Sequence, residues 1–191
     1  MTLNTDWIKR MDNHKLHLGI DGTLSFLKST VNTENVVTGE KGYNTTRYPD
    51  GGNSMHTVEA FATHVWNISQ KLSMHDGIRL GYATTYSSVK DTEQFPFFGG
   101  GSQRKNNLTY SAAIGLNYLP SKTWKTAFSV STAYRVPNID NTSKVFDSKV
   151  GTVTIPNKHI RPEKTVSADL NITKHVADVL TWENVVYATY Y

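Results

Sequence analysis

Alternation of apolar and polar side chains with a period of two runs through most of the chain, and helical periodicity is hard to find. The stretch 108–119 is the clearest case, with one apolar face made by Leu108, Tyr110, Ala112, Ile114, Leu116 and Tyr118. The pattern predicts about seven strands, at 15–28, 55–68, 72–86, 108–119, 124–135, 164–173 and 179–191. We therefore expect an all-β fold, with residues 1–191 in one domain.

Two strands have imperfect faces. In 72–86, Asp76 interrupts an otherwise apolar face. In 179–191 two alternations compete, and we place Glu183 on the polar face. The apolar face of this strand then carries Leu180, Trp182, Val186 and Tyr190.

The connections between the predicted strands alternate strictly between short and long. Roughly five residues make up each of the connections 67–71, 119–123 and 174–178, whereas 31–54, 87–107 and 136–163 have roughly twenty or more. In an up-and-down antiparallel sheet, alternate connections lie at the same edge, so one edge receives all the long loops. This asymmetry is typical of transmembrane β-barrels in outer membranes, which have short periplasmic turns and long extracellular loops.

The composition of the two faces favours the same interpretation. The polar face of 108–119 carries small, uncharged side chains where a solvated sheet would carry Lys and Glu, which suits a lumen that is packed against something inside it. Aromatic residues stand near the ends of the apolar faces, as in the aromatic girdles of membrane barrels: Trp66, Tyr82, Tyr86, Tyr110, Tyr118, Trp124 and Tyr134. A soluble all-β sandwich, with these aromatics in its core, is the alternative.

About seven strands are fewer than the eight of the smallest single-chain barrels. An open sheet would leave unpaired backbone groups in lipid, which is costly. The sequence also stops within a predicted strand, at VVYATYY. We therefore expect a partial transmembrane β-barrel of antiparallel up-and-down strands, without a plug domain, that is a fragment of a larger protein.

No catalytic motif stands out. Hydrophobic residues make up 38% and charged residues 19%, and the net charge of +4 is scattered, so the sequence does not predict nucleic-acid binding. There is no cysteine, no HExxH or GxSxG motif, and the histidines are isolated or, like His14 and His17, on opposite faces of a strand. The start is not a signal peptide, and no apolar run is long enough for a transmembrane helix. We expect neither an enzyme nor a metal site.

The long loops are the predicted binding regions. YNTTRYPDGGN and FPFFGGGSQRK mix aromatic residues, glycines and a basic residue, a composition that suits recognition. From these two loops we select as candidate ligand contacts Arg47, Tyr48, Phe95, Phe97 and Phe98.

Two spaced segments, YRVPN and PNKHIRPE, resemble a pair of boxes found in TonB-dependent outer-membrane receptors. The matching box residues are Tyr134, Arg135, Pro137, Asn138, Pro156, Asn157, Pro162 and Glu163, and Val136 stands where the family usually has alanine. KVFDS and RYPDG resemble the Bacteroidetes branch of that family, which is often associated with uptake of haem, haemoglobin or siderophores.

The resemblance implies a barrel of about 22 strands around an N-terminal plug, residence in the cell outer membrane in contact with its lipid, and a TonB complex engaged through a missing N-terminal region. It implies energised uptake of an iron-bearing ligand, namely haem, a haemoprotein or a ferric siderophore, with no resident cofactor. His159 is a candidate ligand contact, but no histidine lies between Asn138 and Ile155, where haem receptors carry one, so the ligand stays open. A non-transporting barrel or adhesin that displays its loops is the alternative.

Overall fold

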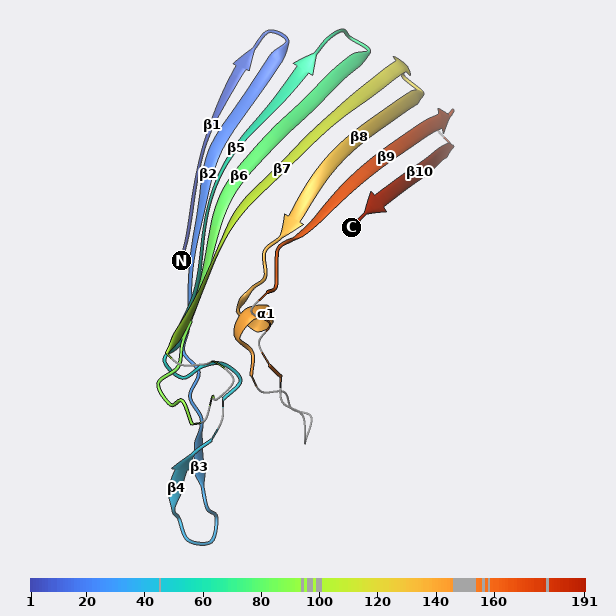
Figure 1. Ribbon diagram of the computed structural model, residues 1–191. Helices are drawn as coiled ribbons and strands as arrows, with labels where there is room; N and C mark the ends of the chain where they lie inside the picture. The colour runs from blue at the N-terminus through green and yellow to red at the C-terminus, as the bar shows by residue number, and fades with distance from the viewer. Residues whose placement is uncertain are drawn as a thin grey trace.

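The computed structural model describes residues 1–44, 46–93, 95, 98, 101–145, 154, 155, 157, 159–177 and 179–191, apart from the side chain of Tyr43. Eight strands form one antiparallel sheet in the order β1-β2-β5-β6-β7-β8-β9-β10, each beside its neighbour in sequence (Figure 1). Their bounds are β1 Thr2–Met11, β2 His14–Leu27, β5 Gly52–Asn67, β6 Leu72–Ser88, β7 Ser102–Ser121, β8 Trp124–Arg135, β9 Glu163–Val176 and β10 Leu180–Tyr190. The fold class predicted from the alternation is confirmed.

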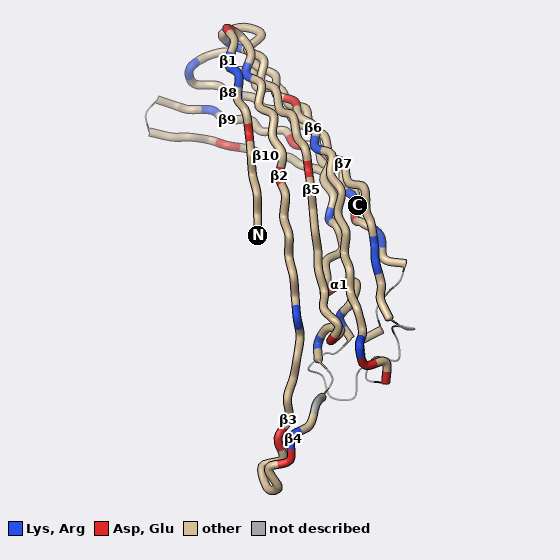
Figure 2. The backbone as a smooth tube through the Cα atoms, turned by 90° about the vertical axis from the view of Figure 1, so that its left-hand side faces the viewer, with Lys and Arg blue, Asp and Glu red and all other residues tan. Residues whose placement is uncertain are grey.

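The structure adds three strands to the seven predicted ranges. β1 is an edge strand, and Lys9 interrupts the face that Leu3, Trp7 and Met11 share, so its alternation is weak. A small hairpin of β3 (Asn32–Glu34) and β4 (Lys41–Tyr43) stands within the first long connection. Figure 2 shows the large sheet as a single curved layer, with this hairpin projecting beyond one end.

Connection lengths separate the two ends of the sheet. The short turns follow β1, β5, β7 and β9 at one end, and the long connections 28–51, 89–101 and 136–162 gather at the other, as predicted. The second long connection is shorter than the predicted 87–107, because β6 and β7 continue into it as paired strands up to Ser88 and Ser102. We call these two ends the short-turn end and the long-loop end.

The even-numbered side chains of β6 form an apolar face that nothing in the described structure covers. Ile78 is 56% exposed and Leu80 is 57% exposed. At about 3.3 Å per residue and a strand tilt of about 40°, the stretch from Leu72 to Tyr82 covers about 25 Å along the sheet axis, the height of the apolar band of a membrane barrel. We call this face the outward face.

Asp76 lies on the outward face, where its carboxylate has a hydrogen-bond partner. Its Oδ1 accepts a hydrogen bond from His64 Nδ1 at 3.0 Å, and His64 Nε2 lies 2.9 Å from His14 Nδ1. The His14 ring also stacks on Trp66. Ionisable side chains at membrane depth are costly unless they pair with one another, so this chain of hydrogen bonds explains how the apolar face tolerates an aspartate.

On the opposite, inward face, glycines make room for large side chains of neighbouring strands. The Phe61 ring lies across Gly19 on β2, where an added Cβ would come within 2.4 Å of it. His75 lies across Gly115 on β7, where an added Cβ would stand 2.2 Å from the ring nitrogen. The two glycines therefore leave room for Phe61 and His75 to lie across the neighbouring strands on the inward face.

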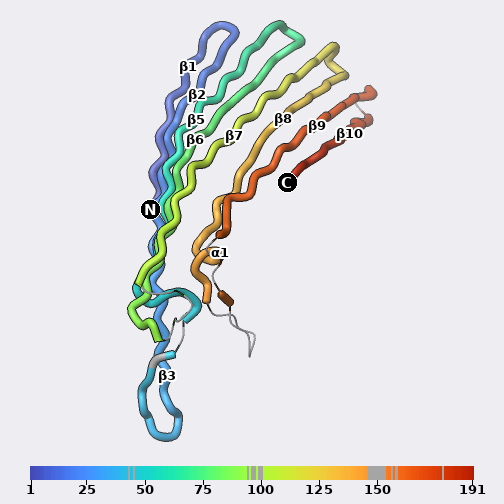
Figure 3. Tube along the Cα trace, in the orientation of Figure 1, coloured from blue at the N-terminus to red at the C-terminus, as the bar shows by residue number. Residues whose placement is uncertain are grey.

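The outer edges of the sheet are β1 and β10, which carry the two chain ends (Figure 3). Within the described residues these two strands do not pair, so the sheet is an open arc of a barrel. On β10, Glu183 Oε1 accepts a hydrogen bond from Asn171 Nδ2 at 2.6 Å on the inward face. The predicted orientation of this strand is therefore confirmed.

Among the described residues there is one α-helix. α1 spans Ile139–Ser143 and lies at the long-loop end, against β5 and β6. In the part of the chain that the structure describes, no helix combines the length and apolar character needed to span a membrane.

Candidate functional site at the long-loop end

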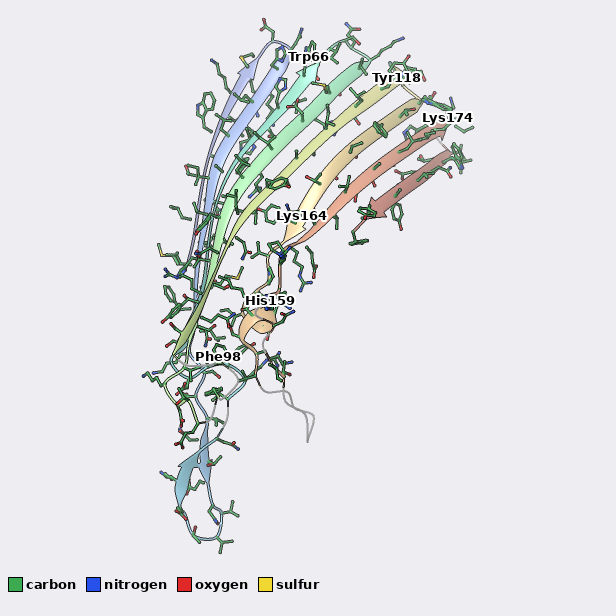
Figure 4. The ribbon with its side chains drawn as sticks, viewed as in Figure 1. Trp66, Phe98, Tyr118, His159, Lys164 and Lys174 are labelled. Atoms are coloured by element: carbon green, nitrogen blue, oxygen red, sulfur yellow. The ribbon has the colours of Figure 1, made fainter. Side chains whose placement is uncertain are left out.

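The three long connections fold together into a cap at the long-loop end. Val89, Phe95, Phe98 and Val145 form its buried apolar cluster, with Phe95 only 2% exposed and Phe98 6% exposed. The backbone N–H of Val145 donates to the carbonyl of Arg47 at 3.0 Å, which joins the first connection to the third. Figure 4 places Phe98 at this end, and Trp66 and Tyr118 at the short-turn end, where an aromatic girdle was predicted.

The YRVPN box spans the end of β8 and the start of the third connection, and its last residue, Asn138, caps α1. The Asn138 side chain accepts a hydrogen bond from the Asn141 backbone N–H at 3.1 Å, and the Asn141 side chain accepts one from the Asn138 backbone N–H at 3.2 Å. This reciprocal cap satisfies two backbone donors that the helix cannot satisfy itself. Pro137, just before it, is buried. The box therefore ends a strand and begins a helix.

Asp140 on α1 draws Arg47 and Tyr48 together from the first connection. Arg47 donates to Asp140 Oδ1 at 3.1 Å, and the Tyr48 hydroxyl donates to the same oxygen. The Tyr48 and Arg47 hydrogen bonds hold the pKa of Asp140 below its ordinary value. The same bond to Asp140, together with partial burial, raises the pKa of Tyr48. Two predicted ligand contacts thus form a clasp between two loops.

The alternation predicted that the Tyr134 side chain points outward, and this prediction is wrong. β8 pairs with β7 only from Ser131 towards the short-turn end. Beyond that point β8 bends away from β7 (Figure 1), and the Tyr134 hydroxyl reaches the inward face to donate to Glu59. The early end of the β7–β8 pairing is the physical reason for this correction.

Glu59 is part of a charged network on the inward face. Arg79 lies between two carboxylates, 2.6 Å from Glu59 Oε2 and 2.8 Å from Asp21 Oδ2, and its guanidinium lies over the Phe61 ring. Asn4 donates to Asp21 at 2.7 Å. The network links β1, β2, β5, β6 and, through the tyrosine, β8. Sequence reasoning missed it because its members come together only through strand register.

The two family boxes face each other across the β8–β9 pair. Arg135 is the direct partner of Glu163, and their side chains form an exposed ion pair at 3.2 Å. Pro162 is half-buried beside them. The spacing of the boxes in sequence therefore reflects one hairpin whose long connection lies between them.

His159 is exposed near this hairpin, and its label in Figure 4 lies beside α1. Its backbone N–H donates to the Asn157 side chain at 2.8 Å, and Lys105 donates to the Asn157 carbonyl at 3.1 Å. Two further predicted site residues, Phe97 and Pro156, lie outside the described residues. The described residues contain no group of three His, Asp or Glu side chains that could hold a metal ion.

Comparison with known proteins places the sheet in a family. Residues 1–191 match the family described as TonB dependent receptor-like, beta-barrel. No curated protein matches the chain. The solved structure of the copper transporter OprC superposes with a TM-score of 0.78 at 16% identity, covering 98% of this chain and 29% of OprC. The ferric yersiniabactin uptake receptor FyuA from Yersinia pestis gives a TM-score of 0.59 at 15% identity, covering 98% of this chain and 27% of FyuA.

The chain thus spans less than a third of either solved protein. At identities this low, the two superpositions establish a shared fold and nothing more. The family match extends over every strand of the sheet. The chain belongs to the TonB-dependent receptor-like β-barrel family.

Proposed function

We propose that this chain is the middle-to-late part of the barrel of an outer-membrane receptor that takes up an iron-bearing ligand with energy supplied through TonB. Receptors of this family lie in the outer membrane, interact with TonB and transport small ligands, and are not enzymes. The observation that carries the proposal is the folded cap at the long-loop end, which would face the outside of the cell.

Contacts between described residues of the three connections join them in the cap. Besides the Asp140 clasp, the Asp50 side chain accepts hydrogen bonds from the backbone N–H groups of Lys90 at 2.8 Å and Asp91 at 3.2 Å, which ties the first connection to the second. A preordered surface loses less conformational entropy when a ligand binds. That property suits a receptor that captures a dilute ligand.

The predicted contact residues divide into two groups in the cap. Arg47 and His159 are exposed and Tyr48 is half-buried, so these three are the proposed ligand contacts. Phe95 and Phe98 are buried, and we propose that they support the contact surface from beneath.

The solved relatives and two exposed side chains support a metal-bearing ligand. The two solved relatives are named for copper and for ferric yersiniabactin, which supports a metal-bearing ligand. Arg47 suits an anionic ligand, because a guanidinium binds carboxylate and similar groups in a bidentate manner. Exposed His159 suits contact with haem iron. Haem, a haemoprotein and a ferric siderophore therefore remain the proposed ligands. Membership of the Bacteroidetes branch of the family is also part of the proposal.

The test uses the receptor with its native flanking sequence. Binding of haem and of ferric siderophores is measured on the purified protein, and uptake of the ligand that binds is measured in cells with and without TonB. We expect uptake only with TonB, and weaker binding for Arg47→Ala or His159→Ala than for Lys122→Ala at the short-turn end. Binding without any TonB-dependent uptake would contradict the transport proposal.

A barrel that displays loops without transport is the second candidate. The β3–β4 hairpin favours it, because Val36 at its tip is 99% exposed on an arm that projects beyond the sheet (Figure 2). A plug domain encoded upstream would favour transport, and a barrel without one would favour display.

A further inference from the structure

A hollow on the outward face at the long-loop end has a lining unlike the rest of that face. It has a volume of about 600 Å³ and lies where β2, β5 and β6 meet the loops. Its lining combines two aromatic rings, two lysines and small polar groups: Phe26, Leu27, Lys28, Asp50, Gly51, Gly52, Asn53, Ser54, Tyr86 and Lys90. We call this surface the rim patch and include Arg104, which is paired directly with Tyr86.

The rim patch lies just beyond the apolar band. Tyr86 is on the same face of β6 as Tyr82, four residues further along the strand. That separation is about 10 Å along the membrane normal at the strand tilt used above. The polar headgroup layer extends about 5–8 Å beyond the hydrocarbon on each side of a bilayer. The hydrocarbon core, about 30 Å thick, extends about 2.5 Å beyond each end of the apolar band of about 25 Å. Tyr86, and Phe26 at the same level of the sheet, therefore lie about 7.5 Å beyond the hydrocarbon, in the outer part of the headgroup layer.

The charge of the rim patch is positive. Lys28, Lys90 and Arg104 are all exposed, and in the described part of the chain none of them forms an ion pair with a carboxylate. The Arg104 guanidinium lies 5.9 Å from the centre of the Tyr86 ring. The one carboxylate in the lining, Asp50, accepts the two backbone hydrogen bonds described above, so its oxygens are directed at the loop.

We propose that the rim patch binds a phosphorylated lipid of the outer leaflet, with the lipid phosphates held by Lys28, Lys90 and Arg104. The rings of Phe26 and Tyr86 supply an apolar surface against which the lipid headgroup rests. Charge complementarity at headgroup depth, on a face that already meets lipid, favours a lipid over a soluble anion. The inference rests on the proposed outer-membrane location and on the long-loop end facing outward.

The test compares the complete receptor with the triple variant Lys28→Gln, Lys90→Gln, Arg104→Gln. The matched control removes three cations near the short-turn end, in Lys71→Gln, Lys122→Gln, Lys125→Gln. The probe is phosphatidylcholine nanodiscs with and without lipid A bearing both phosphates, and retained lipid A is counted by native mass spectrometry. At about fivefold per cation near an anionic surface, we expect retention to weaken by roughly 100-fold in the rim variant and little in the control.

Three outcomes would overturn the proposal: equal loss in both variants, equal retention of lipid A that lacks its phosphates, or displacement of lipid A by millimolar inorganic phosphate. The last would assign the patch to a soluble anion. Heat-modifiable migration on gels confirms that each variant is folded. Uptake of the transported ligand by the unaltered receptor is measured in parallel. Normal TonB-dependent uptake by an unaltered receptor that retains no lipid A would overturn this inference and leave the proposed function intact.

Discussion

Replacement of Ile78 by arginine separates a membrane-facing strand from a soluble one. Ile78 is 56% exposed on the outward face of β6, about 15 Å from Leu72 and about 10 Å from Tyr82 along the axis, and therefore close to the middle of the apolar band. If that face met water, a charged substitution at so exposed a site would change the folding free energy by no more than about 0.5 kcal/mol. In lipid, arginine near the midplane costs about 2–4 kcal/mol, or roughly 30- to 900-fold in the folding equilibrium.

The matched control is Thr63→Arg. Thr63 is exposed on the inward face, beside the Ala62–Ile78 pair, so a long cation there stays out of lipid and should cost less than about 1 kcal/mol. Folding free energies are measured by urea titration of the receptor, with its native flanking sequence, in phospholipid vesicles. Equal free energies for wild type and Ile78→Arg, or a larger loss for Thr63→Arg, would refute the assignment of the two faces.

Three further changes test the network and the clasp. Tyr134→Phe removes the hydrogen bond to Glu59 and should lower the folding free energy by about 1–2 kcal/mol. Tyr110→Phe, which removes an exposed contact with Lys164, should leave the folding free energy nearly unchanged in the same titration. Asp140→Asn should weaken an exposed pair by about 1 kcal/mol or less and speed proteolysis of the loops in a timed digest, and an unchanged digest would contradict the clasp. Because the folded pKa of Asp140 is depressed, its contribution to the stability of the clasp is complete above the ordinary aspartate pKa and is lost as pH falls through the folded value. Loop cleavage by an acid-active protease should therefore rise only on acidification. A rise near neutral pH would contradict a role for the Asp140 carboxylate in the clasp.

The sheet could be read from the sequence because each strand carries its own signal. Alternation marked seven of the eight large strands, and the lengths of the connections predicted which end would carry the loops. β1 was missed because Lys9 breaks its apolar face. The β3–β4 hairpin was missed because three-residue strands are too short to show a period.

The contacts at the long-loop end could be predicted only in part. Arg47 and Tyr48 stood out by composition, but their shared partner, Asp140, lies more than ninety positions away in the chain and had no local signal. Phe95 and Phe98 also stood out as loop aromatics, yet burial of their rings depends on Val145 from another connection. The orientation of Tyr134 required knowledge of where β8 leaves β7. Register and long-range packing, which are set by the whole sheet, decide such contacts.

A spin-label scan along β6 determines whether its even-numbered side chains face lipid. Residues 1–191 contain no cysteine, so a single cysteine introduced on β6 carries the label at a known position. Collision rates with oxygen, which concentrates in lipid, and with a water-soluble nickel complex are measured in the complete receptor in bilayers. If the outward face meets lipid, oxygen accessibility is high and nickel accessibility low at Met74, Ile78, Leu80 and Tyr82, and the oxygen signal is lost at Ser73, His75, Arg79 and Ala83. Accessibility without a period of two, or nickel contact at Ile78 and Leu80, would contradict a lipid-facing barrel wall.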